Sequence, residues 1–157
     1  MTSFQLVGLD PAAFAPLWSL PADRLAEIGA MRLTADASPG FPCRIGLVDA
    51  DAGDELMLLP YEHQPAATPY RASGPIFVRR GARRAALAPG ELTPYVTSRL
   101  MSVRGYDAQH MIVDAGVCEG SALRAEIERQ LAEPGVAYLH LHNARRGCFA
   151  CRVDRVG

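Results

Sequence analysis

Hydrophobic residues recur with a helical spacing in the last third of the chain. Leu123, Ile127 and Leu131 follow one another every fourth residue, which places their side chains on one face of a helix. A Pro-Gly pair follows directly, and this pair ends a helix because proline cannot continue it and glycine is a common stop. The pattern predicts a helix over about 121–133, the longest helix that we expect.

The remaining pattern predicts short strands, turns and short helices. Proline is favourable at the first position of a helix, where its missing N–H is not needed, so we expect helices that begin near Pro11, Pro21 and Pro94. Short apolar or alternating runs bounded by turn residues predict strands. These strands are residues 31–36, a hairpin of 43–48 with 55–59, residues 76–80, a strand-turn-strand unit over 100–117, and a hairpin at the C-terminus.

Tight turns between strands indicate antiparallel pairing, because parallel neighbours need long crossover connections. We therefore predict an α+β fold with a largely antiparallel sheet, two short N-terminal helices, and the helix 121–133 before the C-terminal hairpin. The chain has 157 residues, a length that suits a single domain over 1–157.

The stretch 60–75, PYEHQPAATPYRASGP, contains four prolines and has no hydrophobic period, so we expect a long loop. A loop of this length inside a compact domain commonly carries function. Tyr61 and His63 follow an apolar strand, where binding residues often sit on a rigid scaffold. Arg71 lies later in the same loop, and the alternative role for Arg71 is to tie the loop down.

The C-terminal stretch YLHLHNARRGCFACRVDR predicts a hairpin whose register follows from its apolar residues. Leu139 and Leu141 share one face of the first strand, and Phe149 and Cys151 share one face of the second. Both sets turn into the core only if Leu141 lies opposite Phe149, since a slip of one residue turns one set outward. Residues 143–147 then form the connecting loop.

This register places His142 opposite Cys148, with Cβ atoms roughly 4.5–5.5 Å apart. An imidazole beside a thiol is the minimum for a cysteine nucleophile, because the imidazole holds the proton and leaves a thiolate. The candidate catalytic residues are therefore His63, His142 and Cys148. The competing interpretation is a solvated polar face that includes a cysteine.

His140 and His142 share a strand face, and His63 is a third imidazole. Three imidazoles with one position open for water are a common set for a divalent metal. We favour no cofactor and keep His63, His140 and His142 as the alternative metal ligands, against a structural reading as hydrogen-bonded histidines at a sheet edge. A four-ligand zinc site is not expected, because the strand period directs Cys148 and Cys151 to opposite faces.

The loop between the two strands adds Asn143 and Arg145 to the candidates. An arginine favours a thiolate or binds an anion, so Arg71 and Arg145 are expected to orient an anionic small molecule. The candidate ligand-binding residues are Tyr61, Arg71, His140, Asn143 and Arg145.

Composition narrows the expected partners. The formal net charge is -1 and all 16 basic residues are arginines, so an arginine cluster by itself says little, and no interleaved aromatic residues support nucleic-acid binding. No apolar run approaches the roughly 18 residues that span a bilayer, and the first residues lack the pattern of a secretory signal. We expect no nucleic-acid partner, no membrane, and a cytoplasmic location in which the four cysteines are free thiols.

Three blocks of sequence carry a resemblance to a known family. They are GFPCRIGLVDADAGDELMLLPYEHQPAATPYRASGPIFVR, MIVDAGVCEG and VAYLHLHNARRGCFACRVDR. These blocks resemble a bacterial family catalogued as domain of unknown function 1203, over nearly the whole chain. The resemblance implies a small stand-alone bacterial domain and implies no activity, substrate or catalytic residue.

Two functions stay open at this point. The first is a small-molecule binding or enzymatic site between the 60–75 loop and the 138–152 hairpin, which as an enzyme would use Cys/His or His–metal chemistry. The second is a non-catalytic interaction module that uses the same polar loops as a partner surface. Either is compatible with a monomer or a homodimer.

Overall fold

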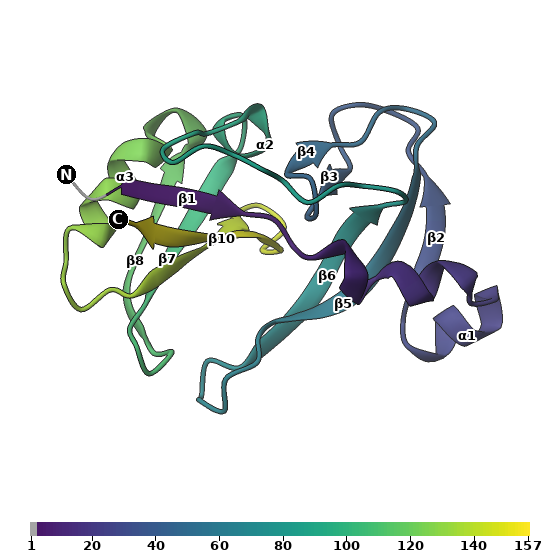
Figure 1. Cartoon of the computed structure of the whole chain (residues 1–157), viewed down its shortest axis with the longest axis horizontal. Coiled ribbons are helices and arrows are strands. Elements are labelled where there is room, and N and C mark those ends of the chain that lie inside the picture. Colours follow the sequence, from purple (N-terminus) through teal and green to yellow (C-terminus); the bar gives the residue numbers. More distant parts are fainter. Residues whose placement is uncertain (1–2) are drawn as a thin grey trace.

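The computed structural model describes residues 3–157, which form two five-stranded β-sheets with short helices around them (Figure 1). Within this range the strand pairs are antiparallel except for one parallel bridge between Cys43 and Phe77. The predicted α+β class with mainly antiparallel strands is confirmed.

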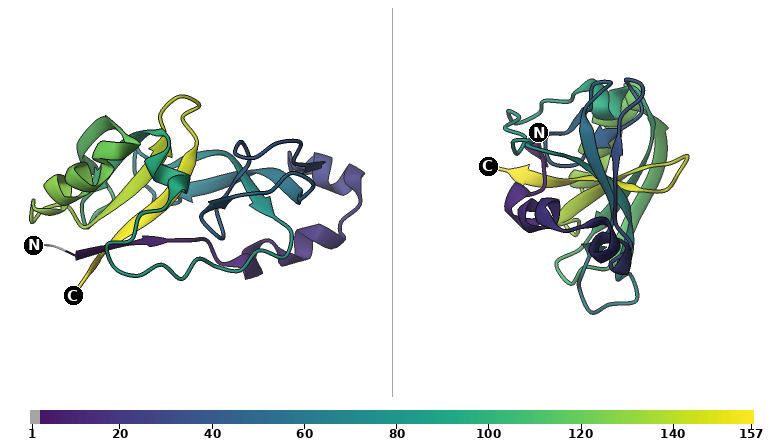
Figure 2. Two further views of the ribbon diagram at one scale, coloured as in Figure 1. Left: turned by 90° about the horizontal axis from the view of Figure 1, so that it is seen from above. Right: turned by 90° about the vertical axis from the view of Figure 1, so that its right-hand side faces the viewer.

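The first sheet lies at the end of the molecule that holds the C-terminus and β1 (Figures 1 and 2). Its strands run in the order β1 (Ser3–Val7), β10 (Phe149–Val156), β9 (Tyr138–Asn143), β7 (Leu100–Tyr106) and β8 (Ile112–Glu119). A 3-10 turn at Gly120–Ala122 leads into α3 (Leu123–Leu131), which packs against β7 and β8. The predicted helix over 121–133 and the strand-turn-strand unit over 100–117 are confirmed.

The second sheet has the order β2 (Met31–Thr34), β5 (Glu55–Gln64), β6 (Ala72–Arg79), β3 (Pro42–Cys43) and β4 (Val48–Asp49). The predicted strand over 43–48 is wrong, because the chain turns at 44–47 and β4 pairs with β3 rather than with β5. Leu47 adopts a left-handed backbone with φ 54° and its side chain is fully buried. The segment 43–48 is apolar because it includes a buried turn residue, Leu47, and this apolar run resembled a strand in the sequence.

Short helical segments lie next to the second sheet. They are two 3-10 turns at Pro11–Ala13 and Ala15–Ser19, followed by α1 (Ala22–Glu27). A further short helix, α2 (Pro94–Thr97), comes directly before β7. The Asp10 carboxylate accepts a hydrogen bond from the Ala12 backbone N–H at 3.0 Å and so caps the first turn. The predicted helix starts near Pro11, Pro21 and Pro94 are confirmed. No helix in residues 3–157 is long and apolar enough to span a lipid bilayer.

The predicted loop over 60–75 is shorter in the structure, because β5 and β6 extend into it from both sides and only 65–71 lie outside strands. β2 pairs with β5 only as far as Leu58. Pro60 therefore lies where that side of β5 has no strand neighbour, and its missing N–H removes no ladder hydrogen bond. Proline content alone overestimated the length of the loop.

Each sheet has its own cluster of buried side chains. Leu123 and Ile127 of α3 pack with Leu139 and Leu141 of β9 beneath the first sheet. The second cluster joins the N-terminal helical segment to β5 and β6, and it also includes Phe149. Phe149 thus belongs to a strand of the first sheet and packs into the core of the second.

A β-bulge in β10 causes this change of side. Phe149 lies opposite His142 and Cys151 lies opposite Leu141, so Ala150 is the extra residue. The predicted register, with Leu141 opposite Phe149, is wrong because it assumed an uninterrupted two-residue period through CFAC. With the bulge, Ala150 and Cys151 both belong to the first core, whereas Phe149 turns to the other face.

Two buried side chains bind the backbone of the bulge. Arg44 Nε donates to the Phe149 carbonyl at 2.8 Å, and the Tyr95 hydroxyl donates to the Ala150 carbonyl at 2.7 Å. Arg44 and Tyr95 are 1% and 2% exposed. A bulge interrupts the strand ladder, so these two donors satisfy carbonyl groups that would otherwise be buried without partners.

We expect Tyr95→Phe to lower the free energy of unfolding by about 1–3 kcal/mol, because the Ala150 carbonyl then stays buried without this donor. Urea unfolding followed by circular dichroism measures the change. Tyr70→Phe removes the same hydroxyl from an exposed residue and is expected to change the value by less than about 0.5 kcal/mol. Equal losses in the two variants would contradict a role of the hydroxyl in holding the bulge.

Candidate functional site

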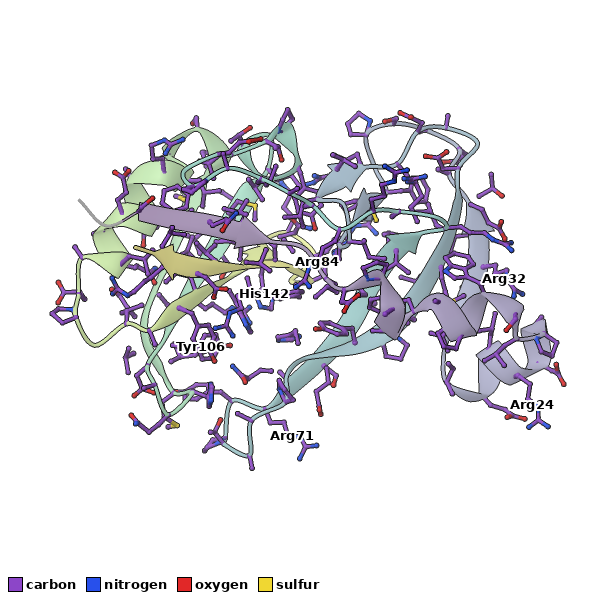
Figure 3. All side chains as sticks on the ribbon, viewed as in Figure 1. Arg24, Arg32, Arg71, Arg84, Tyr106 and His142 are labelled. Atoms are coloured by element: carbon purple, nitrogen blue, oxygen red, sulfur yellow. The ribbon has the colours of Figure 1, made fainter. Side chains whose placement is uncertain are left out.

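Three histidine rings meet where the end of β5 approaches the polar face of the first sheet. His63 comes from β5, and its ring centroid lies 4.8 Å from that of His142 and 5.9 Å from that of His140, both on β9. The centroids of His140 and His142 are 6.4 Å apart. Figure 3 labels His142 and Tyr106 on the side of the first sheet that faces β5. We call His63, His140 and His142 the histidine cluster.

The two-residue period of β9 sets which side chains reach the cluster. His140 and His142 point to one face of β9. The alternating residues Leu139 and Leu141 enter the core on the other face. In the register of the sheet, His140 lies between Arg104 of β7 and Arg152 of β10. His142 lies beside Phe149 because of the bulge.

Phe149 provides an aromatic surface that all three imidazoles contact. Its ring stacks on His63 with 9° between the planes and 5.4 Å between the centroids. His140 and His142 meet it edge to face, with centroids at 5.1 Å and 5.8 Å. Such pairs are favourable beyond the area that they bury, so Phe149 holds the cluster together.

Four buried ring nitrogens of the cluster have no hydrogen-bond partner among the residues described: both nitrogens of His63, Nδ1 of His140 and Nε2 of His142. His142 Nδ1 lies 3.0 Å from the Gly147 carbonyl oxygen. Because a carbonyl only accepts, His142 carries its proton on Nδ1 and keeps a lone pair on Nε2. Buried polar atoms are normally paired, and a concentration of unpaired ones is typical of a binding site.

Burial keeps the cluster uncharged. Desolvation, together with the other histidines and nearby arginines, lowers the pKa of His140 to about 3. Desolvation also lowers the pKa of His142 to about 4, although its bond to Gly147 opposes the change. The pKa of His63 is lowered by burial and then by the charge of Arg104. At neutral pH the three rings are therefore neutral imidazoles, each with one N–H donor and one lone pair that accepts a hydrogen bond.

Two adjoining cavities open beside the cluster, one of about 360 Å³ and one of about 260 Å³. Both are lined by His63, Pro65, His140 and Arg152, and we call the two together the histidine cleft. The larger cavity is also lined by the aromatic rings of Phe14, Tyr61 and Phe149. Its volume falls within the range of small-molecule sites.

Arginines give the histidine cleft an excess of positive charge. Arg84 and Arg152 line the larger cavity, and Arg104 lies beside the cluster. Among the described residues only Arg152 of these three makes an ion pair, with Asp154 at 2.5 Å. Arg84 and Arg104 bond to neutral oxygens instead, a carbonyl and a hydroxyl. Asp10 is the one acidic residue among the lining residues of the larger cavity, and Figure 3 shows Arg84 between the two sheets.

Cys148 lies outside the cluster. Its Sγ accepts hydrogen bonds from Arg44 Nη2 at 3.1 Å and from Asn143 Nδ2 at 3.5 Å. The register that paired Cys148 with His142 is wrong, because the bulge brings Phe149 into that position. A catalytic role for Cys148 stays a prediction without the neighbouring imidazole that motivated it.

The predicted ligand-binding residues divide among three places. Tyr61 lines the histidine cleft together with His140. Asn143 and Arg145 line a separate cavity of about 340 Å³. Arg71 pairs with the neighbouring β5 carboxylate of Glu62 at 3.0 Å on the exposed side of the β5–β6 hairpin, and Figure 3 shows it pointing away from the cluster.

The imidazoles of the cluster do not converge as metal ligands. Residues 3–157 contain no group of three or more His, Cys, Asp or Glu side chains placed to hold a metal ion. The rings of His63 and His142 meet edge to face, with 79° between their planes. His63, His140 and His142, the alternative metal ligands, therefore lie together as a cluster, but they are not placed to hold a metal ion.

The sequence prediction missed Arg84, Arg152 and Phe149 at this site. Arg152 carried a usable signal, since strand alternation places it on the face opposite Cys151 and hence beside His140. Phe149 was hidden by the bulge. Arg84 belongs to the irregular segment between β6 and α2, which no hydrophobic period positions.

The fold and the cleft define an α+β protein with a polar, aromatic-walled site between its two sheets. The chain belongs to the family described as Protein of unknown function (DUF1203), whose sequence profile matches residues 40–155. That range includes the whole histidine cluster, Phe149 and the cleft arginines, whereas β1 and the N-terminal helical segment lie outside it. No curated protein and no solved structure matches the chain.

We expect the protein to lose stability as the pH falls from about 6.5 to about 5. An unfolded histidine has a pKa near 6.5, whereas the folded pKa values of His140 and His142 are about 3 and about 4. In this window only the unfolded state binds these protons, so each group lowers the free energy of unfolding by up to about 1.4 kcal/mol per pH unit. Urea unfolding across the window measures the slope.

A double variant, His140→Phe with His142→Phe, is expected to flatten that slope because both protons are then absent from the unfolded state as well. His110→Gln removes the imidazole outside the histidine cluster, which is exposed at the β7–β8 hairpin although its Nδ1 lies 2.7 Å from the Tyr138 hydroxyl, and it is expected to leave most of the slope in place. A slope that survives the double substitution would show that other groups cause the acid sensitivity.

Proposed function

We propose that the histidine cleft binds a small organic anion with an apolar body. One observation carries this proposal: a single cavity of about 360 Å³ is lined by two guanidinium groups, three aromatic rings, and two imidazoles with buried nitrogens that have no partner among the described residues. None of these features is unusual alone, and together they match what a small carboxylic acid needs.

The two arginines support the choice of an anion. Arg84 and Arg152 use their Nε atoms for the hydrogen bonds that they make to Gly8 and Asp154. Their Nη groups make no hydrogen bond to the described residues and stay available to a ligand, and a guanidinium binds a carboxylate best in a bidentate pair. The Arg152 guanidinium also lies 3.9 Å from the centroid of the Tyr138 ring, which fixes its direction.

The aromatic walls support an apolar body for the anion. Phe14, Tyr61 and Phe149 line the same cavity as the two arginines. Phe14 and Tyr61 pack with 6.2 Å between their ring centroids, and Tyr61 and Phe149 with 5.9 Å. A ligand that combines a carboxylate with an aliphatic or aromatic group gains from both surfaces.

The neutral histidines support an enzymatic form of the proposal. His63 and His140 line both cavities of the cleft, and burial lowers the pKa of each ring. A general base works best with a pKa near the operating pH, so His140, with a pKa of about 3, is a weak base and His63 is the candidate for this role. In an enzymatic form, His63 would take the proton of an O–H or C–H bond of the ligand, and the electron pair of that bond would stay on the ligand.

We place this function in the bacterial cytoplasm, with no nucleic-acid or membrane partner. The support is that Cys43, Cys118, Cys148 and Cys151 are free thiols, as expected in a reducing compartment. The alternative, a protein-interaction module, predicts that the cleft residues contact a protein and bind no small anion.

Isothermal titration of the purified protein with acetate, hexanoate, benzoate and phenylacetate tests the proposal. We expect the acids with an apolar group to bind more tightly than acetate. Arg84→Met and Arg152→Met each remove a cleft cation and are expected to weaken binding about tenfold or more. Arg71→Met removes the same charge from a residue with a side chain that is 58% exposed and paired outside the cleft, and it is expected to leave the affinity unchanged.

Three outcomes would contradict the proposal. The first is the absence of binding by every acid in the series. The second is an equal loss in Arg71→Met and in the cleft variants, which would indicate a nonspecific effect of charge. The third is a stoichiometric metal in the purified protein that His63→Ala removes, because the site would then be a metal centre.

A further inference from the structure

We propose that the anion bound in the histidine cleft carries a hydroxyl group that donates a hydrogen bond to His63, so that the ligand class is a hydroxy acid with an apolar body. This inference rests on the proposed function and adds a specificity-determining residue to it.

The order of hydrogen-bond donors and acceptors begins at Gly147. Its carbonyl oxygen accepts from His142 Nδ1 at 3.0 Å, so His142 Nε2 holds a lone pair. The His142 side chain is 1% exposed, and this Nε2 has no donor among the residues described. A buried acceptor without a donor is unfavourable by about 1–3 kcal/mol, so a neighbouring donor improves the site.

His63 is the neighbour that can supply that donor. Its ring centroid lies 4.8 Å from that of His142, and within residues 3–157 neither of its nitrogens has a hydrogen-bond partner. A neutral imidazole carries one N–H and one lone pair. If the His63 N–H donates to His142 Nε2, the other His63 nitrogen is left as an acceptor.

The other groups that face His63 do not change this direction. Phe149 stacks on its ring and offers no hydrogen bond. Arg104 acts on it through charge, and His140 lies 5.9 Å away between centroids. The other His63 nitrogen is buried in the free protein. Because His63 lines both cavities of the cleft, this acceptor is left for a ligand that fills them.

A ligand at this acceptor must present a hydrogen-bond donor. Its carboxylate is held by Arg84 or Arg152, which line the same cavity. An ammonium group fits less well, because Arg104 already acts on His63 through its positive charge. Two arginines also line the larger cavity, against one carboxylate, that of Asp10. A hydroxyl group donates without adding charge, which selects a hydroxy acid over an amino acid.

The test compares benzoate with its 2-, 3- and 4-hydroxy derivatives and the matched methoxy derivatives by isothermal titration. A methoxy group accepts but cannot donate. We expect at least one hydroxy isomer to bind about three- to tenfold more tightly than benzoate, and its methoxy partner to bind no more tightly than benzoate. In His63→Phe, which keeps an aromatic ring against Phe149, the ratio of the affinity for the hydroxy isomer to the affinity for benzoate is expected to fall to about one, whatever the change in benzoate affinity itself. Arg71→Met, outside the cleft, is expected to leave that ratio unchanged.

The tautomer of His142 gives a second measurement that needs no variant. Its imidazole ¹⁵N chemical shifts are expected to report a protonated Nδ1 and an unprotonated Nε2, and an Nε2–H tautomer would overturn the proposal. Equal affinities for benzoate and every hydroxy isomer, or a hydroxy preference that survives in His63→Phe, would also overturn it while leaving anion binding intact. If no acid in the series binds, this proposal fails together with the proposed function.

Discussion

The bulge in β10 is the constraint on which the site depends. One extra residue at Ala150 turns Phe149 out of the core of the first sheet, and Cys151 then returns to that core. The backbone at this point is held by Arg44 from the β3–β4 turn and by Tyr95 from α2. A strand of one sheet thereby places an aromatic ring in the core of the other, and the two sheets are joined where the histidines meet.

The same junction explains why polar atoms are buried without partners. The imidazoles contact one another and Phe149 through ring faces and edges, so packing rather than hydrogen bonding determines their positions. Such an arrangement lowers the stability of the free protein. Proteins accept that loss mainly at functional sites, and the cavities of about 360 Å³ and about 260 Å³ beside the cluster are where a ligand would relieve it.

Charge in the cleft is divided between two kinds of side chain. Arginines stay protonated at every physiological pH, and Arg104 helps to hold the pKa of His63 and of His142 below the usual range. In the function that we propose, the cations attract the anion and the uncharged imidazoles discriminate by hydrogen bonding. Both kinds of residue lie within the family match over 40–155.

The sequence alone determined the features that depend on local periodicity: the helix at 121–133, the α+β class, and the shared face of His140 and His142. Tertiary structure decided the rest. The extension of β5 through its prolines, the bulge that displaced Phe149, and the contact of His63 with β9 each depend on residues far apart in the chain. The alternation of polar and apolar side chains predicts which face of a strand each residue occupies. It predicts neither a β-bulge nor the position of a second sheet, because packing between distant segments determines both.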